Sequence, residues 1–247
     1  MKSAAVNRLE SLLQASKLGR TLARTDEPWP TVSTGVASLD TALSGGWRVG
    51  EISELTGPRS SGRTTMLMAT LAAATARGEI VGLVDALDRF DPMVAAAAGV
   101  DLDRLLWVRG ATLTVERARP AMIEQSVQRA VRAFDLIIRA GGFGVVALDL
   151  AGVSARVVQM LPFTTWMRLA HANEGRQTVG LIVGDIAVGR SARGVSVHLR
   201  ASPQWIGASP QSRRFNGFKW DRSIDLSIYR SIEERSGRVT SDFQIDR

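Results

Sequence analysis

The chain has 247 residues, which is long enough to bury one sizeable core, and its formal net charge is +7. It contains no cysteine and only two histidines, which excludes disulfides, thiolate nucleophiles and cysteine-bound zinc and argues against a histidine metal cluster. The positive charge favours an acidic partner, most commonly nucleic acid, and a merely solvated basic surface is the plain alternative.

Residues 1–24 place apolar side chains among basic ones, and the first part of this stretch fits an amphipathic helix. The sequence Asp26-Glu27-Pro28-Trp29-Pro30 then ends that pattern, because each proline lacks a backbone donor and biases its predecessor to extended geometry. We therefore predict an N-terminal arm and linker at 1–30 and a core domain at 31–247. The arm packs either on its own core or on a partner. Neither a signal-peptide core nor a run of about 20 apolar residues is present, so we expect a cytoplasmic protein.

A phosphate-binding loop is predicted at 57–65. The apolar run 52–55 indicates a buried strand, and 66–77 is a strongly helix-forming segment ended by Gly78. A glycine-bounded loop between a strand and a helix can cradle phosphates with its backbone N–H groups and the helix N-terminus. The candidate phosphate-binding residues are Gly57, Ser60, Ser61, Gly62, Arg63, Thr64 and Thr65.

The basic residue of this loop is Arg63, where an active nucleotide hydrolase carries lysine. Lysine is a compact ammonium that reaches between the terminal phosphates, whereas arginine is a wide planar fork. The loop is therefore a strong indication of a phosphate-loop fold and only a weak indication of nucleotide hydrolysis.

Further apolar runs predict strands at 80–84, 145–149 and 178–185. Helical patterns are predicted at 115–140, with Pro120 near the start, and at 162–173. Strands that alternate with helices indicate an α/β fold with a mostly parallel central sheet flanked by helices. Asp149 ends the second of these strands, where a carboxylate either helps to hold Mg²⁺ or caps the next turn.

The stretch 186–220 contains no acidic residue and interleaves basic with aromatic side chains. Basic groups track a phosphate backbone and aromatic faces stack on bases, but tryptophan and arginine also anchor protein interfaces, and short core strands with exposed arginines are a third explanation. The candidate DNA- or partner-binding residues are Arg190, Arg193, Arg200, Trp205, Arg213, Arg214, Phe215, Lys219 and Trp220.

Residues 221–232 alternate apolar and polar, a turn follows at 233–237, and 239–245 returns as a second strand. We predict that this C-terminal β-hairpin extends the edge of the sheet.

Several motifs together resemble the RecA-type ATPase core. They are Ser33-Thr34-Gly35 with Leu39-Asp40 and Gly45-Gly46, the loop at 57–65, and the sequence 85–92 followed by Gly99-Val100-Asp101. The resemblance implies that the glutamate orienting the attacking water is replaced by Leu87, with Asp88 a poor substitute. It also implies that the glutamine sensing the terminal phosphate is replaced by Asp185. No cofactor is then required, no metal site is expected, and the remaining loop and Asp149 leave room only for weak binding of ATP and Mg²⁺.

A RecA-like core with a degraded ATP site resembles the ImuA family of SOS-inducible bacterial proteins. That resemblance implies a non-catalytic adaptor in translesion synthesis and mutagenesis, with RecA, an ImuB-like polymerase homologue, an error-prone replicative polymerase and single-stranded DNA as candidate partners. It leaves a homo-oligomer open. The alternatives are an active DNA-dependent ATPase or recombinase paralogue, and a regulator gated by ATP without hydrolysis.

Overall fold

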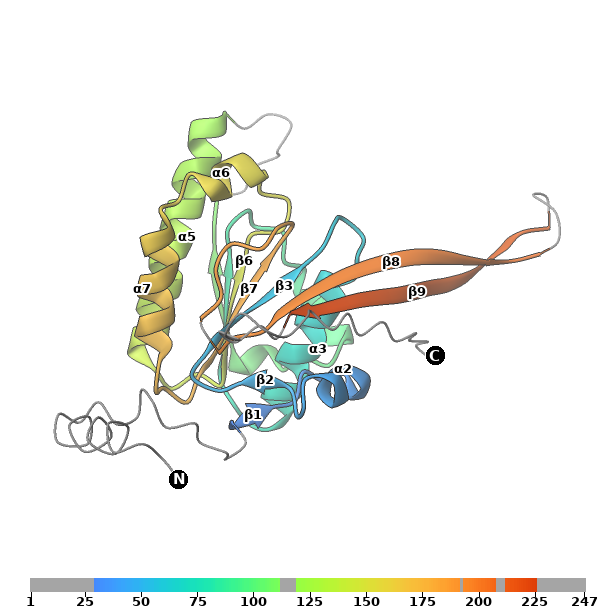
Figure 1. Cartoon of the computed structure of the whole chain (residues 1–247), viewed down its shortest axis with the longest axis horizontal. Coiled ribbons are helices and arrows are strands. Elements are labelled where there is room, and N and C mark those ends of the chain that lie inside the picture. The colour runs from blue at the N-terminus through green and yellow to red at the C-terminus, as the bar shows by residue number, and fades with distance from the viewer. Residues whose placement is uncertain (1–28, 112–118, 192, 208–211, 226–247) are drawn as a thin grey trace, which may run out of the picture. The chain divides into compact units, whose positions relative to one another are not determined.

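The computed structural model describes residues 29–111, 119–191, 193–207 and 212–225. The chain divides into two compact units, Met1–Pro30 and Thr31–Arg247, and the second holds the fold described below. Within the described residues it is built on a seven-stranded sheet in the order β5-β4-β6-β7-β3-β8-β9 (Figure 1). The strands are β3 (Ile52–Thr56), β4 (Val81–Asp85), β5 (Leu105–Arg109), β6 (Val145–Asp149), β7 (Val179–Gly184), β8 (Ser196–Ile206) and β9 (Arg214–Asp225).

Six of these strands are parallel, and β9 runs antiparallel to β8. The central strands are buried along their whole length because helices cover both faces of the sheet, which is why they read as continuous apolar runs in the sequence. The prediction of a mostly parallel α/β core is confirmed.

One face of the sheet packs on the helices α2 (Ala37–Ala42), α3 (Arg63–Ala76) and α4 (Pro92–Ala97), through a core that includes Leu39, Leu71 and Ala95. The other face packs on α5 (Pro120–Ala140), α6 (Ala155–Gln159) and α7 (Phe163–Asn173), through a core that includes Phe134 and Leu169. Figure 1 shows the two helical layers on opposite sides of the strands.

Smaller elements complete the unit. The strands β1 (Thr31–Val32) and β2 (Trp47–Arg48) pair antiparallel, and a 3₁₀ turn, η2 (Leu102–Arg104), leads into β5. Pro120 is the first residue of α5, as predicted, where its missing N–H group costs least. Within the described residues, no helix combines the length and apolarity needed to cross a bilayer.

The hairpin that extends the sheet lies earlier in the chain than predicted. Its strands are β8 and β9. Residues 196–206 form a strand, which the sequence analysis offered only as one of three explanations for 186–220, and the strand expected from residue 221 begins at 214. The return strand predicted at 239–245 lies outside the described residues. Strand β8 pairs with β3 over 196–198 and continues as a two-stranded ribbon with β9 that projects beyond the sheet (Figure 1).

Candidate functional site

The predicted phosphate loop connects the buried end of β3 to the start of α3. Gly62 is the N-cap of α3 and has φ 94°, a left-handed conformation that glycine adopts without strain. A Cβ atom added to Gly57 would lie 2.3 Å from the carbonyl oxygen of Leu199, so this end of the loop packs directly on β8. The local backbone therefore explains both glycines of the motif.

The basic side chain of the loop is already paired. Arg63 forms an ion pair with Asp185 through its Nη1 atom and the Oδ1 atom of the carboxylate, and only 8% of the Arg63 side chain is exposed. The same Oδ1 atom accepts a hydrogen bond of 3.1 Å from the backbone N–H group of Gly152. The two residues that the sequence treats as separate losses thus form one charge-compensated contact between the loop and the segment after β7.

This contact decides how the loop fits a nucleotide. A terminal phosphate needs a cation near position 63, and the guanidinium there is bound by a carboxylate that would itself repel the phosphate. Thr64 and Thr65 are exposed, and Ser61 keeps a buried Oγ atom with no hydrogen-bond partner within the described chain. In this arrangement the cation of the loop is compensated by a carboxylate, and one buried polar atom of the loop lacks a hydrogen-bond partner within the described residues.

Asp149 lies at the end of β6, beside Asp85 at the end of β4. The pKa of Asp149 is raised to about 6, mainly by burial and also by the nearby Asp85, against the lowering effects of Arg63, Arg89 and a 2.8 Å hydrogen bond from the backbone N–H group of Ala151. Asp85 accepts backbone hydrogen bonds from Leu87 (3.3 Å) and Phe90 (2.7 Å). Both carboxylates therefore support turns at the carboxyl edge of the sheet, which is the capping role weighed for Asp149.

The raised pKa of Asp149 predicts a pH-dependent stability. Because the folded protein holds this proton more tightly than the unfolded chain, the group favours folding most below pH 4, and that contribution is lost as the pH rises from about 4 to about 6. We expect Asp149→Asn, which keeps an acceptor for Ala151, to raise the melting temperature at pH 7.5. Thermal unfolding at pH 7.5 and pH 4.5 checks this, and an equal gain at both pH values would contradict it.

The position expected to orient water is apolar and faces away from the loop. Leu87 is 3% exposed and packs in the core beneath α5. Its neighbour Asp88 has φ 55° and forms a two-bonded ion pair with Arg109, from Nε to Oδ1 (2.8 Å) and from Nη2 to Oδ2 (2.9 Å). Arg109 also stacks on Trp107, with 4.6 Å between its Cζ atom and the ring centre. Asp88 is therefore held by β5.

Sequence analysis missed a histidine beside the loop. His198 on β8 stands in register with Thr56, the last residue of β3, and its Nδ1 atom lies 3.1 Å from the Thr56 hydroxyl. Burial lowers the pKa of His198, and the neighbouring Arg200 and Arg63 lower it further. The alternation of Val195, Val197 and Leu199 was the available signal for a strand that places His198 here.

The predicted DNA- or partner-binding residues separate into two groups. Arg190 and Arg193 belong to the segment between β7 and β8, where Arg190 Nη1 donates to the carbonyl of Gly194 (3.1 Å) and the Arg193 carbonyl accepts from Arg48 Nη1 (2.6 Å). Glu51 is buried close to them, and burial raises its pKa while Ser191 and Arg193 lower it. This first group supports a loop against the sheet.

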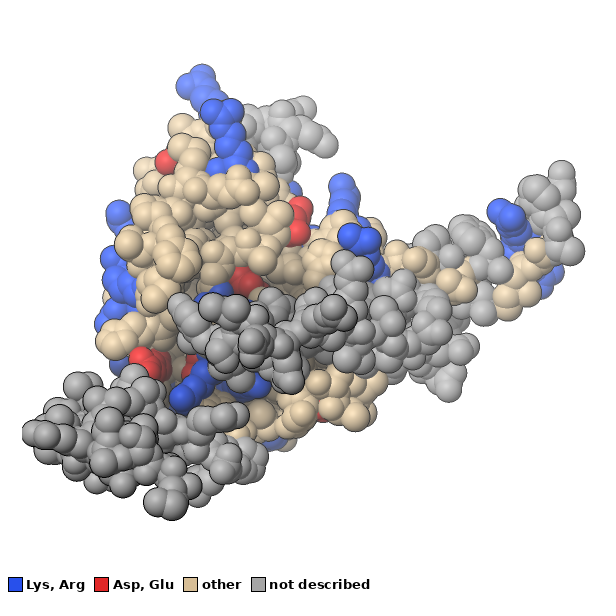
Figure 2. Space-filling view, viewed as in Figure 1, with Lys and Arg blue, Asp and Glu red and all other residues tan. Residues whose placement is uncertain are grey.

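The second group lies on the ribbon of β8 and β9. Arg200, Arg213 and Arg214 are exposed, and Figure 2 shows basic side chains at the far end of the ribbon. The register places Trp205 opposite Phe215, Ser202 opposite Lys219 and Ala201 opposite Trp220. The ribbon thus gathers seven of the nine predicted positions, Arg200, Trp205, Arg213, Arg214, Phe215, Lys219 and Trp220.

Comparison with known proteins agrees with the fold and the loop. Residues 3–157 match the RecA N-terminal domain. Protein RecA of Parasynechococcus marenigrum (strain WH8102) is 31% identical over 179 residues, which is 72% of this chain and 39% of that protein. Protein RecA of Sinorhizobium medicae (strain WSM419) is 40% identical over 120 residues, which is 48% of this chain and 29% of that protein. The matched part is thus about two fifths or less of each relative. The chain belongs to the RecA N-terminal domain family.

Proposed function

We propose that this protein is a non-catalytic RecA-like adaptor in bacterial DNA damage tolerance, as in the ImuA branch of the family. It serves SOS-dependent translesion synthesis and mutagenesis by contacting RecA, an ImuB-like polymerase homologue and single-stranded DNA. An error-prone replicative polymerase completes the assembly that it supports. It acts in the cytoplasm, and its scaffold, rather than nucleotide turnover, provides the function.

One observation carries the proposal, namely the ion pair between Arg63 and Asp185. Catalysis of phosphoryl transfer is nearly all positioning and charge stabilisation. Here Asp185 neutralises the cation of the phosphate loop. The position expected to orient water is Leu87, a core residue, and the nearest carboxylate in sequence, Asp88, is paired with Arg109. The three substitutions together support a loop that serves as structure.

A regulator gated by ATP without hydrolysis is the second candidate. The buried Ser61 Oγ atom, which lacks a partner within the described chain, favours it, because a phosphate oxygen could supply the missing hydrogen bond. Tight ATP binding without phosphate release would distinguish this candidate from the adaptor.

Capture of the ImuB-like partner tests the adaptor directly. We expect the immobilised protein to retain that partner equally with ATP, with ADP and after enzymatic removal of nucleotide. The paired variant Arg63→Met with Asp185→Leu should retain it as well, since it replaces the ion pair by apolar side chains of similar size. Capture that requires ATP, or that is lost with a well-folded paired variant, would contradict the proposal.

Single-stranded DNA binding by the ribbon makes a separate prediction. We expect Arg213→Ala with Arg214→Ala to weaken binding and to reduce the slope of log affinity against log salt by about 1.4, at about 0.7 per lost phosphate contact. Fluorescence anisotropy with an oligonucleotide at several salt concentrations measures this. Arg156→Ala with Arg168→Ala removes two exposed charges elsewhere and serves as the control. An unchanged slope in the ribbon variant would assign the ribbon to protein partners.

A further inference from the structure

The outer face of α7 carries apolar side chains where a surface helix usually carries polar ones. Its inner face is buried through Trp166 and Leu169. On the outer side Phe163 is 67% exposed and Met167 is 54% exposed, and Met160, the C-cap residue of α6, is 57% exposed. A helix at the surface of a globular protein normally turns charged or polar residues to solvent, and a group of exposed apolar residues marks an interaction site.

The three exposed side chains lie close together. Phe163 and Met167 are one turn apart on α7, so their Cβ atoms are about 5–6 Å apart. Met160 comes three residues before Phe163, in the turn between α6 and α7. Two of the three are methionines, whose flexible thioether side chains adapt to the shape of a partner. We name this set, with the flanking Arg156 and Arg168, the α6–α7 surface.

The core on the inner side of α7 is closely packed. Trp166 is buried there, and a Cβ atom added to Gly189 would lie only 2.8 Å from the Trp166 Cβ atom. Glu54 holds this backbone in place, because its Oε1 atom accepts a 2.6 Å hydrogen bond from the N–H group of Gly189. The core is therefore filled without Phe163 and Met167, which stay at the surface.

The charges around the α6–α7 surface are positive. Residues 150–173 contain no aspartate or glutamate. Arg156 and Arg168 are exposed, and neither forms an ion pair with any residue that the structure describes. The next carboxylate, Glu174, lies 3.2 Å from the Nδ1 atom of His171. Figure 2 shows a largely uncharged surface over α6 and α7, with basic side chains at its border. A partner with acidic side chains is the electrostatic complement.

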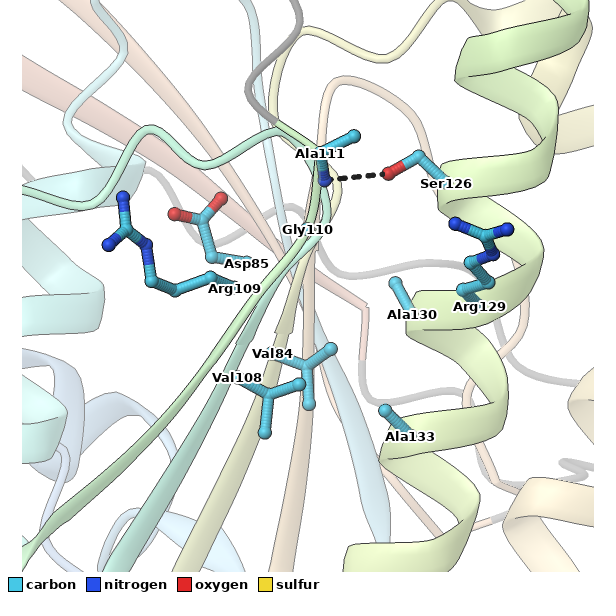
Figure 3. Close-up of a pocket in the computed structure, with 10 residues that line it drawn as sticks. All are labelled: Val84, Asp85, Val108, Arg109, Gly110, Ala111, Ser126, Arg129, Ala130 and Ala133. Carbon is cyan, nitrogen blue, oxygen red and sulfur yellow. Dashed lines mark hydrogen bonds between the residues drawn. The ribbon is translucent and has the colours of Figure 1, made fainter.

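The cavity between β5 and α5 belongs to a different face. Its volume is about 340 Å³, and its lining residues come from β4, β5, the two residues after β5, and α5 (Figure 3). Arg129, which lines it, and Arg132 are exposed on α5, so they provide a matched pair of charges for comparison. The α6–α7 surface can therefore be altered without changing the cavity.

Three other occupants match the α6–α7 surface less well. A second copy of the chain would bring the same two arginines against Arg156 and Arg168. A nucleic acid strand calls for a row of cations along its phosphates, whereas this surface has an apolar centre with charge at its border, as protein interfaces do. The N-terminal arm at 1–24 is itself basic, with Lys2, Arg8, Lys17, Arg20 and Arg24 against Glu10.

We propose that the α6–α7 surface binds an acidic amphipathic helix of a protein partner. Apolar residues of that helix, spaced three and four apart, pack on Met160, Phe163 and Met167, and its acidic residues pair with Arg156 and Arg168. A helix fits better than a strand, because α7 uses its backbone N–H and C=O groups internally and offers none to a strand. This inference rests on the proposed function, in which the protein acts by holding a polymerase-homologue partner.

Binding of the purified ImuB-like partner tests the apolar centre. We expect Phe163→Asp with Met167→Asp to raise the dissociation constant at least tenfold, because it removes the apolar anchors and adds charge that repels an acidic helix. Met93→Asp with Val94→Asp is the matched control, since these residues are 79% and 55% exposed on α4, across the sheet, and it should bind as the native chain does. Melting temperatures establish that both variants are folded.

The outcomes separate this inference from the proposed function. Equal affinity of the native chain and of Phe163→Asp with Met167→Asp would overturn the inference and leave the adaptor standing. No binding by the native chain would overturn both.

Peptides of the partner test the charged border. Overlapping synthetic peptides that span the partner's sequence serve as probes. We expect the tightest peptide to be acidic, with apolar residues at helical spacing, and its affinity to fall as salt is raised. Arg156→Ala with Arg168→Ala should weaken this peptide about three- to tenfold and flatten the salt dependence, whereas Arg129→Ala with Arg132→Ala should do neither. A basic peptide as the tightest binder, or equal effects of the two arginine pairs, would overturn the proposal.

Two further measurements examine the other occupants. Phe163→Asp with Met167→Asp should leave the sedimentation of the chain and its affinity for a thymidine oligonucleotide unchanged, and removal of residues 1–28 should leave partner affinity unchanged. A native oligomer that the double variant dissociates would assign the α6–α7 surface to a second copy, and lost oligonucleotide binding would assign it to nucleic acid. Tighter partner binding after removal of 1–28 would assign it to the arm, and each of these results would overturn the proposal.

Discussion

Asp185→Asn should turn the phosphate loop into a better anion site. The substitution removes the negative charge that neutralises Arg63 while leaving an oxygen that can accept from Gly152. Loss of one adjacent charge is worth about 1.4–2.8 kcal/mol here, so we expect ATP to bind about 10- to 100-fold more tightly than to the native chain. Calorimetric titration with ATP and Mg²⁺, and separately with pyrophosphate, measures the change.

The control adds Arg63→Ala to Asp185→Asn. If the gain comes from freeing the guanidinium, the double variant should lose it. Melting temperatures of the variants establish that each is folded. Equal ATP affinity in the native chain and in Asp185→Asn would mean that this carboxylate does not block the loop.

Glu54→Ala should be the most destabilising of the substitutions considered. Glu54 is 2% exposed on the central strand β3, and its Oε1 atom accepts backbone hydrogen bonds of 2.6 Å from both Val188 and Gly189. Its Oε2 atom accepts a 2.6 Å bond from the Ser196 hydroxyl. Removing the carboxylate leaves these buried donors without an acceptor, and we expect a loss of about 3–4 kcal/mol in the free energy of unfolding. Chemical denaturation measures it.

Two variants sharpen that result. Glu54→Gln keeps one acceptor oxygen and should lose less than Glu54→Ala. Glu174→Ala removes an exposed carboxylate, whose side chain is 72% exposed, and should change stability by less than about 0.5 kcal/mol. A loss for Glu54→Ala no larger than that for Glu174→Ala would show that Glu54 does not hold the segment between β7 and β8.

Local patterns predicted the central core well. The strands β3, β4, β6 and β7 are short apolar runs bounded by glycine or a carboxylate, and burial on both faces leaves that pattern in the sequence. Strand β8 was not singled out because Val197 and Leu199, with Val195 just before the strand, stand among arginines, whose charge suggested a binding loop. The basic composition concealed a half-buried strand.

The central contact of the site could not be predicted from local patterns. Arg63 and Asp185 are 122 residues apart and meet because β3 and β7 are neighbours in the sheet. Each position alone reads as the loss of a required group, and only the strand order shows that the two substitutions compensate each other. The pairing of Asp88 with Arg109 depends in the same way on the contact between β4 and β5.

The central claim is that this RecA-like core has kept its scaffold while Asp185 neutralises Arg63, the basic residue of its nucleotide loop. Phosphate release from ATP, with and without single-stranded DNA, tests it most directly, with a RecA protein as the positive control. We predict that the native chain releases phosphate no faster than Arg63→Ala under either condition. Release that DNA stimulates and that Arg63→Ala abolishes would contradict the account.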